Sequence, residues 1–210
     1  MILVTGASGN IGSALVRTLR ERNATFRVAE RDTPIDDRTS VRLNFLDPSS
    51  FAAAVDGCHA VFLLRPPAIA RMKPTLNAFV DVARAAGVAH IVFVSVSGAD
   101  RNPIVPHHAV EQHLQAGRRD WTILRPGFFA QNLIDAYRRD IVEDDRIYVP
   151  AGAARVSFID ARDIADVAAT ALFDPGSHRG CAYSLNGPDC LSFAEVAAIL
   201  TGALDRAIEY

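Results

Sequence analysis

The fold of this chain is decided close to its start, in the stretch Thr5-Gly6-Ala7-Ser8-Gly9-Asn10-Ile11-Gly12. A short apolar run, Ile2-Leu3-Val4, comes before it. An amphipathic segment from Ile11 to Arg22 follows, with apolar residues at the spacing of one helical face. A strand, a glycine-rich loop and a helix in this order are typical of the first turn of a dinucleotide-binding fold.

The three glycines of this loop have different expected tasks. Gly6 permits the tight turn, Gly9 lets the backbone approach a ligand, and Gly12 brings the helix close to the strand. The start of the helix then offers N–H groups and a partial positive charge to a pyrophosphate. The residues that we expect to bind a dinucleotide here are Gly6, Ser8, Gly9, Asn10, Ile11 and Gly12. The alternative is a glycine-rich turn without a ligand, and a P-loop is excluded because the Gly-Lys-Ser/Thr ending is absent.

Strand-like and helix-like segments alternate along the rest of the chain. The expected strands are 2–4, 26–29, 41–45, 60–64, 88–96, 121–124 and 182–185, and the expected helices are 11–22, 47–56, 74–86, 110–116, 128–141, 160–173 and 193–200. This alternation predicts an α/β fold, a Rossmann-type doubly wound parallel sheet with helices on both faces. We expect one domain, 1–210, in which residues 126–150 and 175–210 contribute a small C-terminal substrate lobe.

Composition, charge and cysteine content limit the kinds of protein that this chain can be. The chain has 210 residues, of which 50% are hydrophobic, and a formal net charge of −2, which together are typical of a folded globular domain. No excess of positive charge attracts nucleic acid or an anionic membrane, and we expect neither a signal peptide nor a membrane-spanning helix. Cys58, Cys181 and Cys190 are an odd number without a close pair, so we expect reduced thiols, no metal site and a cytoplasmic location.

The choice between NAD and NADP depends on the residues after the second expected strand. An acidic residue about 20 positions after the glycines bonds the ribose 2′-hydroxyl of NAD, whereas an arginine binds the 2′-phosphate of NADP. Glu30 lies 18 positions after Gly12 and is followed by Arg31. Glu30 would repel a phosphate unless it turns away or pairs with Arg31, and the alternative for both residues is a solvated charge pair.

Four stretches carry a resemblance to a known family. They are the glycine loop, Asn44-Phe45-Leu46-Asp47, Trp121-Thr122-Ile123-Leu124-Arg125-Pro126-Gly127-Phe128-Phe129 with Asn132, and Phe158-Ile159-Asp160-Ala161-Arg162-Asp163-Ile164-Ala165. Over nearly its whole length the chain resembles the NmrA-like branch of the atypical short-chain dehydrogenases/reductases. That group includes NAD(P)H:quinone reductases, triphenylmethane reductase-like enzymes, and redox-sensing regulators that bind dinucleotide without turning it over.

The resemblance implies a set of cofactor contacts. It favours NADP(H) over NAD(H), because relatives place an arginine after the second strand, where this chain has Arg31. It also implies that Phe45 lies by the adenine and that Leu64, Arg65 and Pro66 line the cofactor after the fourth strand.

One departure from the wider superfamily concerns its catalytic pair. Most members use Tyr-x-x-x-Lys, in which the lysine lowers the pKa of the tyrosine and holds the nicotinamide ribose. Lys73 is the only lysine of this chain, and none of its tyrosines has a lysine four residues later. The family register places Pro103 at the tyrosine position and His107 at the lysine position. We therefore name no catalytic acid, and we expect His107 to contact the ribose or to donate a proton near neutral pH.

A second departure concerns length. Relatives are usually longer at the C-terminus, which implies a shortened substrate lobe and an open site if the chain ends at Tyr210.

Residues at the ends of two buried strands are further candidates. Ser95 and Ser97 follow the fifth strand, where the ligand crevice of a parallel sheet lies, so we expect one of them, Ser95, to face the nicotinamide, with turn capping as the alternative. Phe128 and Phe129 follow the sixth strand and contact either a flat ligand or the core.

Two polar clusters have structural explanations. Asp160 and Asp163 lie at a helix start, where capping is favoured over paired-carboxylate chemistry. His108 and His113 lie near His107, but no carboxylate at metal-ligand spacing accompanies them, so a metal site is not expected.

The sequence thus favours a cytoplasmic NAD(P)H-dependent oxidoreductase that reduces a small, electron-poor, quinone-like or aromatic substrate without the Tyr-x-x-x-Lys pair. The alternative is a non-catalytic NAD(P)-binding redox sensor of NmrA type, acting through a regulatory protein partner. A sugar-nucleotide epimerase is disfavoured because the tyrosine–lysine pair is missing. A homodimer remains open, and neither nucleic acid nor membrane is expected as a partner.

Overall fold

A seven-stranded sheet forms the centre of the molecule in the computed structural model, which describes residues 1–32 and 39–210. Its strand order is β3-β2-β1-β4-β5-β6-β9. The strands from β3 to β6 pair in parallel, with Ile2 opposite Phe26 on one side and Ala60 on the other. The order reverses between β1 and β4, so the predicted Rossmann-type doubly wound sheet is confirmed.

The element bounds follow the alternation of the sequence. The strands are β1 (Ile2–Val4), β2 (Phe26–Glu30), β3 (Ser40–Arg42), β4 (Ala60–Leu64), β5 (His90–Val94), β6 (Trp121–Pro126), β7 (Phe128–Phe129), β8 (Arg155–Ile159), β9 (Cys181–Leu185) and β10 (Cys190–Ser192). The α-helices are α1 (Asn10–Glu21), α2 (Phe51–Val55), α3 (Ala78–Ala85), α4 (Pro106–Gln115), α5 (Arg138–Glu143), α6 (Ala161–Phe173), α7 (Pro175–His178) and α8 (Phe193–Leu204). Three further short helices are wound differently from an α-helix. They are the 3₁₀-helices η1 (Pro48–Ser50) and η3 (Ala130–Leu133) and the π-helix η2 (Lys73–Asn77).

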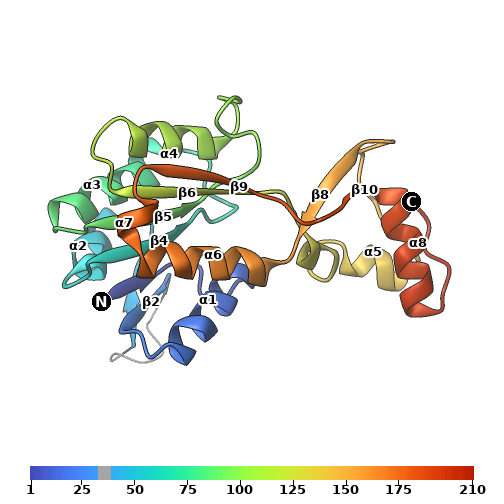
Figure 1. Ribbon diagram of the computed structural model, residues 1–210, viewed down its shortest axis with the longest axis horizontal. Coiled ribbons are helices and arrows are strands. Elements are labelled where there is room, and N and C mark those ends of the chain that lie inside the picture. The colour runs from blue at the N-terminus through green and yellow to red at the C-terminus, as the bar shows by residue number, and fades with distance from the viewer. Residues whose placement is uncertain (33–38) are drawn as a thin grey trace. The chain divides into compact units, whose positions relative to one another are not determined.

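Helices cover the seven-stranded sheet on both faces. Figure 1 shows α4 above the sheet and α6 below it. Side chains alternate along each strand, and one set joins α2, α3 and α4 in a single apolar core. This core includes Leu3, Val61, Leu63, Ile91, Phe93 and Ile123 from the strands and Phe51, Phe79, Val110 and Leu114 from the helices. On the other side, Thr18 of α1 donates to Asp166 of α6 over 3.3 Å, which joins these two helices.

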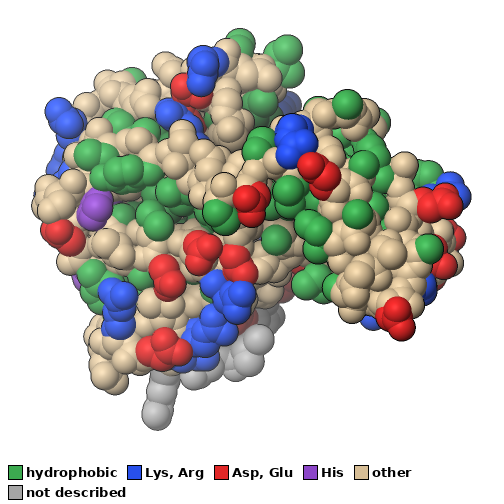
Figure 2. Space-filling model, turned by 45° about the vertical axis from the view of Figure 1, so that its right-hand side comes forward, with side chains coloured by type: hydrophobic (Ala, Val, Ile, Leu, Met, Phe, Trp, Pro, Cys, Tyr) green, Lys and Arg blue, Asp and Glu red, His purple; other side chains and the backbone are tan. Residues whose placement is uncertain are grey.

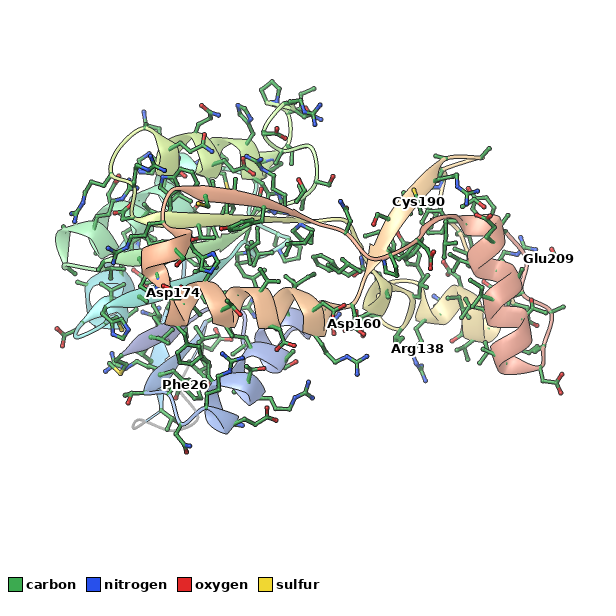
Figure 3. The ribbon with its side chains drawn as sticks, viewed as in Figure 1. Phe26, Arg138, Asp160, Asp174, Cys190 and Glu209 are labelled. Carbon is green, nitrogen blue, oxygen red and sulfur yellow. The ribbon has the colours of Figure 1, made fainter. Side chains whose placement is uncertain are left out.

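The chain divides into two compact units. Unit 1 consists of Met1–Arg125 and Arg162–Ser184, and unit 2 consists of Pro126–Ala161 and Leu185–Tyr210. Asp160 precedes α6 and Asp174 follows it, as Figure 3 shows. The predicted lobe of 126–150 and 175–210 differs from unit 2 in its bounds, because 151–161 belong to unit 2 and 175–184 to unit 1.

Unit 2 has its own small sheet and core. β8 pairs with β10 antiparallel and with β7 parallel. The ring of Phe193, which is 1% exposed, lies 5.4 Å from that of Phe128 and 5.7 Å from that of Phe158 between centroids. Ser192 and Glu195 form a capping box at the start of α8, with the Glu195 N–H donating to the Ser192 hydroxyl over 3.2 Å. Phe128 is thus a core residue of unit 2.

The sequence prediction is wrong for one helix, and it missed two strands. The expected helix 128–141 is instead β7, η3 and α5, because Phe128 and Phe129 pair with Phe158 and Ile159 of β8. The strands β8 and β10 were not predicted, because Arg155–Ile159 and Cys190–Ser192 are short and do not stand out from the loops beside them. Gly127 explains the close approach of β7 and β8, because a Cβ there would overlap the Ser157 carbonyl.

Candidate dinucleotide site

A cavity of about 1010 Å³ lies at the carboxyl ends of β1, β2 and β3, within unit 1. The loop after β1, the helix α1 and the segments after β2, β3 and β4 surround it. The predicted site residues that line it are Gly6, Ser8, Arg31, Phe45 and Pro66. This is the edge of an open parallel sheet at which ligands bind.

The glycine loop has a backbone that only glycine accommodates at two of its three positions. Gly6 has a φ of +65°, and a Cβ there would lie 3.1 Å from Cδ1 of Leu64. A Cβ on Gly12 would overlap the Gly6 carbonyl, so α1 runs close against the loop. Gly9 donates its N–H to the Gly6 carbonyl over 3.0 Å. The expected roles of Gly6 and Gly12 therefore have a direct geometric reason, whereas Gly9 closes the turn.

The amino terminus of α1 is open. Its N-cap, Gly9, provides no side-chain cap hydrogen bond, and the first turn contains no acidic residue. The first helical hydrogen bond runs from Ser13 N–H to the Gly9 carbonyl over 2.9 Å, so the amides of Ile11 and Gly12 precede it. A pyrophosphate fits such a terminus, because the helix presents N–H groups and a partial positive charge without a competing carboxylate.

The side of the cavity at the end of β2 carries the two opposite charges, of Glu30 and Arg31, on which the expected choice between NAD and NADP depends. Glu30 ends β2, and Arg31 and Asp32 follow it along the cavity. The Arg31 Nε lies 3.6 Å from the Asp32 Oδ2, and both side chains are about four-fifths exposed (78% and 83%). Among the described residues the ion pair of Arg31 is solvated and therefore worth little, and the exposed guanidinium is accessible to a ligand in the cavity.

The segment after β3 supplies an apolar wall. Phe45 is 6% exposed, and its ring packs edge-on against Phe51 and Phe79 at centroid distances of 6.4 and 5.4 Å. Asn44 turns the chain here, because its Oδ1 accepts the N–H of Leu46 over 3.0 Å. Phe45 therefore belongs mainly to the core and lines the cavity only at its margin.

Arg65, at the carboxyl end of β4, organises the loop that follows it. Its Nη1 donates to the carbonyls of Pro66 and Pro67, each over 3.1 Å, and to that of Ile69. Its Nε donates to Nε2 of His107 over 3.3 Å. Burial lowers the pKa of Arg65 from its usual value. Arg65 shapes the cavity wall rather than pointing a free charge into it.

His107 lies in the first turn of α4 as a neutral ring. Burial, with the charge of Arg65 as the next cause, lowers its pKa to about 4. The prediction that His107 donates a proton near neutral pH is therefore wrong, because the imidazolium is absent there. His108 and His113 make unrelated contacts, with the Ala99 carbonyl and with Asp81, each over 2.7 Å.

Ser95 belongs to a buried network behind α4. Its hydroxyl donates to the carboxylate of Glu111, which is fully buried. Arg125, at the end of β6, donates to the same carboxylate from Nε over 3.0 Å and from Nη2 over 2.6 Å. Glu111 holds the pKa of Arg125 above its usual value. The charges of Glu111 and Arg125 therefore compensate each other, and the nicotinamide contact expected of Ser95 stays a prediction.

Sequence reasoning missed several residues of the cavity. Thr5 is 2% exposed, and its Oγ1 accepts the N–H of Leu64 over 2.8 Å, which joins the ends of β1 and β4. Its place directly before the first glycine was the available signal. Ser13, Arg20 and Ile69 also line the cavity, but no motif distinguishes them from other surface or core residues.

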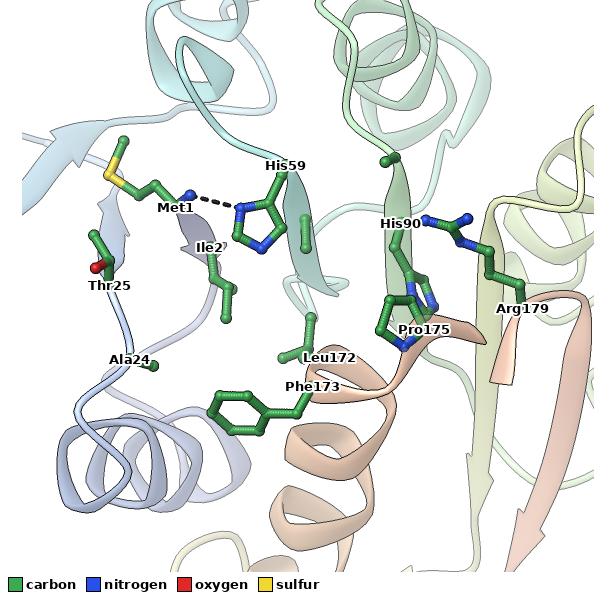
Figure 4. Close-up of a pocket in the computed structure, with 12 residues that line it drawn as sticks. Met1, Ile2, Ala24, Thr25, His59, His90, Leu172, Phe173, Pro175 and Arg179 are labelled. Atoms are coloured by element: carbon green, nitrogen blue, oxygen red, sulfur yellow. Dashed lines mark hydrogen bonds between the residues drawn. The ribbon is translucent and has the colours of Figure 1, made fainter. Parts of the chain in front are cut away.

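A second cavity lies at the opposite, amino-terminal edge of the same sheet. It measures about 420 Å³, and Figure 4 shows Met1, His59, His90 and Arg179 among its lining residues. The amino group of Met1 lies 2.6 Å from Nδ1 of His59. No glycine loop and no amino terminus of a long helix opens into this cavity among the described residues that line it.

Comparison with known proteins agrees with the geometry of the first cavity. A family model described as NAD(P)H-binding matches residues 6–175, from the first glycine of the loop onward. The chain belongs to the NAD(P)H-binding family. The predicted membership among the atypical short-chain dehydrogenases/reductases is confirmed. The prediction that the chain is an NAD(P)H-dependent reductase is also confirmed, at the level of the family.

Two bacterial oxidoreductases are among the relatives of this NAD(P)H-binding chain. It is 37% identical to the NAD(P)H azoreductase of Xenophilus azovorans, over 100% of this chain and 76% of that protein. It is 33% identical to an uncharacterized oxidoreductase, YesF, of Bacillus subtilis, over 100% of this chain and 73% of the relative.

Solved structures share its fold at lower sequence identity. The triphenylmethane reductase of Citrobacter sp. in complex with NADP(H) has a TM-score of 0.84 and 23% identity, over 99% of this chain and 77% of the other. An NADPH-dependent quinone oxidoreductase of Escherichia coli has a TM-score of 0.83 and 21% identity, over 100% of this chain and 78% of the other.

The described parts of the chain, 1–32 and 39–210, contain neither a candidate metal centre nor a candidate membrane-spanning helix. No group of three or more His, Cys, Asp or Glu side chains is placed to hold a metal ion. No described helix is long and apolar enough to cross a bilayer. On the face drawn in Figure 2, basic and acidic side chains lie next to one another.

Proposed function

We propose that this chain binds NADPH in the cavity at the carboxyl ends of β1, β2 and β3 and reduces a small, flat, electron-poor compound of the quinone or azo class. The observation that carries the proposal is the open amino terminus of α1 beside that cavity. The NAD(P)H azoreductase that is 37% identical over the whole of this chain supports the reaction class.

The residues of the glycine loop hold the pyrophosphate in this proposal. The amides of Ile11 and Gly12 face it at the helix start, and the left-handed turn at Gly6 leaves room for it. Arg31 binds the 2′-phosphate and so selects NADPH over NADH, since a charge-assisted contact distinguishes the two cofactors. His107 orients the nicotinamide ribose through a neutral hydrogen bond.

The charge state of the polar groups around α4 supports an uncharged acceptor. His107 is neutral at pH 7, and the buried carboxylate of Glu111 is compensated by Arg125. A bound nicotinamide cofactor supplies the hydride. His107 is not an acid near neutral pH, so in this proposal the reduced acceptor takes its proton from water, which suits a quinone or azo compound better than a simple ketone.

A single assay tests the proposal. Purified protein is mixed with NADPH and a panel of quinones and azo dyes, and the loss of NADPH absorbance is followed, with NADH in parallel. We expect turnover with at least one acceptor and a lower KM for NADPH than for NADH. Tight NADPH binding without turnover of any acceptor would instead indicate the non-catalytic redox sensor.

A further inference from the structure

We propose that Arg65 is a positioning residue that fixes the tautomer of His107, so that His107 presents an Nδ1–H donor to a bound cofactor or substrate. The proposal deepens the proposed function and rests on it for the identity of the ligand, but the tautomer itself is a property of the free protein.

The direction of the hydrogen bond between the two side chains determines the tautomer. The Nε of Arg65 lies 3.3 Å from Nε2 of His107. A guanidinium has only donors and stays charged in proteins. Nε2 of His107 must therefore accept this bond, and the single proton of the neutral ring must reside on Nδ1.

The position of Arg65 is itself fixed, so the tautomer does not depend on a loose side chain. The carbonyls of Pro66, Pro67 and Ile69 all accept from its Nη1, and these residues surround the guanidinium on the loop after β4. Rotation of Arg65 away from His107 would leave part of this set without a donor. The loop therefore orients Arg65, and Arg65 orients His107.

The Nδ1 of His107 has no partner in the described part of the chain. It is buried, and no hydrogen bond to it is formed there. A buried donor without an acceptor is destabilising. A hydroxyl or carbonyl oxygen of a bound molecule would remove this cost, and so the free protein retains a directed donor whose acceptor comes with the ligand.

Three described residues lie around the imidazole ring of His107, and two of them carry a charge that affects its protonation. Arg65 approaches from the loop after β4 and Glu111 from the next turn of α4, and their charges act in opposite directions. Phe93 of β5 lies at a centroid distance of 6.1 Å and offers no charge. Glu111 already accepts bonds from Ser95 and Arg125. Burial and Arg65 therefore prevail, which keeps the ring neutral above its pKa of about 4.

Nitrogen NMR of the imidazole side chains tests the tautomer directly. In protein labelled with 15N-histidine, with His107 assigned by its loss in His107→Gln, we expect a protonated Nδ1, an unprotonated Nε2, and no titration between pH 5 and 8. Protonation at Nε2, or titration near the usual value of 6.5, overturns the proposal.

Substitution of Arg65 tests its role as the positioning residue. In Arg65→Met we expect the Nε2–H tautomer to appear and the pKa of His107 to rise, because the donor and its charge are both removed. Arg71→Met is the matched control, since Arg71 is an exposed arginine of the same loop, and it should leave the His107 signals unchanged. Unchanged signals in Arg65→Met overturn the proposal.

Addition of NADPH separates this proposal from the proposed function. We expect the Nδ1–H signal to shift and its exchange with water to slow when NADPH saturates the protein. If NADPH binds and the Nδ1–H signal stays unchanged, the donor role is wrong. If NADPH does not bind while the free protein shows the expected tautomer, the proposed function fails and the Arg65–His107 assignment stands.

Discussion

Two cavities lie at opposite edges of the same sheet, and they differ in the backbone that lines them. Each edge of the sheet also has a histidine whose pKa burial lowers to about 4: His107, in the first turn of α4, and His90, which lines the cavity at the amino edge. In the part of the chain that the structure describes, the cavity at the carboxyl edge has the glycine loop and the uncapped terminus of α1 beside it, and the cavity at the amino edge has neither. The comparison teaches that backbone N–H groups, rather than cavity walls or unusual histidines, distinguish the candidate dinucleotide site.

The two histidines also differ in what their free nitrogen can do. His90 lies 2.9 Å from Thr122, whose hydroxyl donates to the His178 carbonyl, so the His90 Nε2 is the donor and its Nδ1 is an unpartnered acceptor. In His107 the Nε2 accepts from Arg65. His90 is 2% exposed and belongs to the interior of the sheet. Similar pKa values thus accompany opposite tautomers, with the proton on Nε2 in His90 and, in our proposal, on Nδ1 in His107.

The largest expected effect comes from adding a methyl group to the glycine loop. In Gly12→Ala the new Cβ overlaps the Gly6 carbonyl, so α1 and the loop must separate. We expect NADPH affinity to fall at least about 100-fold and stability to fall by about 1–3 kcal/mol. Calorimetric titration and chemical denaturation measure both quantities.

The matched control for that substitution lies in α8. A Cβ on Gly202 meets no atom within 4 Å, so Gly202→Ala should leave NADPH binding unchanged and raise stability by about 0.5–1 kcal/mol. Equal binding by Gly12→Ala and Gly202→Ala would show that the loop does not hold the cofactor.

The next largest effect concerns Arg31. In Arg31→Ala we expect NADPH binding to weaken by about 1–3 kcal/mol, because a charge-assisted contact with the 2′-phosphate is lost. NADH binding should change little. Arg17→Ala, which removes an exposed arginine of α1 outside the cavity, is the control. The selectivity role is refuted if Arg31→Ala weakens both nucleotides equally.

The stability of the protein in acid tests whether His90 is buried and neutral in the folded state. The unfolded chain protonates His90 near pH 6.5, whereas the folded protein does so only near 4, so folding stability is lost as the pH falls through this window. Between pH 7 and pH 5 the loss from one such histidine is about 2 kcal/mol. Urea unfolding of His90→Gln should show a smaller loss over this range than the parent protein, and an unchanged loss would contradict the neutral, buried state.

The smallest expected effect concerns Glu30. Removing its charge in Glu30→Gln should tighten NADPH binding by less than about 1 kcal/mol, because the carboxylate faces the same cavity as Arg31 in high-dielectric surroundings. NADH binding should weaken slightly if Glu30 accepts the ribose 2′-hydroxyl. Parallel titrations of both nucleotides decide which of these roles Glu30 has.

The sequence predicted the parts of the fold that depend on strong local signals. The loop from Gly6 to Gly12 and the strands β1, β4 and β5 have clear patterns, since glycine spacing and buried apolar runs are visible in the chain itself. The strands β8 and β10 were missed, because their pairing joins residues 155–159 with 190–192, which are far apart in sequence.

The site was predictable only in part for a similar reason. The glycines and Arg31 follow from motif position, whereas the charge state of His107 depends first on its burial in the fold and then on Arg65, which lies 42 residues earlier in the chain. Thr5 binds the backbone of Leu64 across two strands. Such contacts depend on strand order, and no pattern within one segment contains them.

Amide NMR mapping of NADPH binding tests the central claim most directly, since it reports on both edges of the sheet at once. On titration of NADPH into 15N-labelled protein we predict saturable shifts of the Gly6–Gly12 and Arg31 amides, with His59 and His90 unchanged. Shifts confined to the amino edge around His59 and His90, or no shifts at any amide, would contradict the assignment of the dinucleotide site.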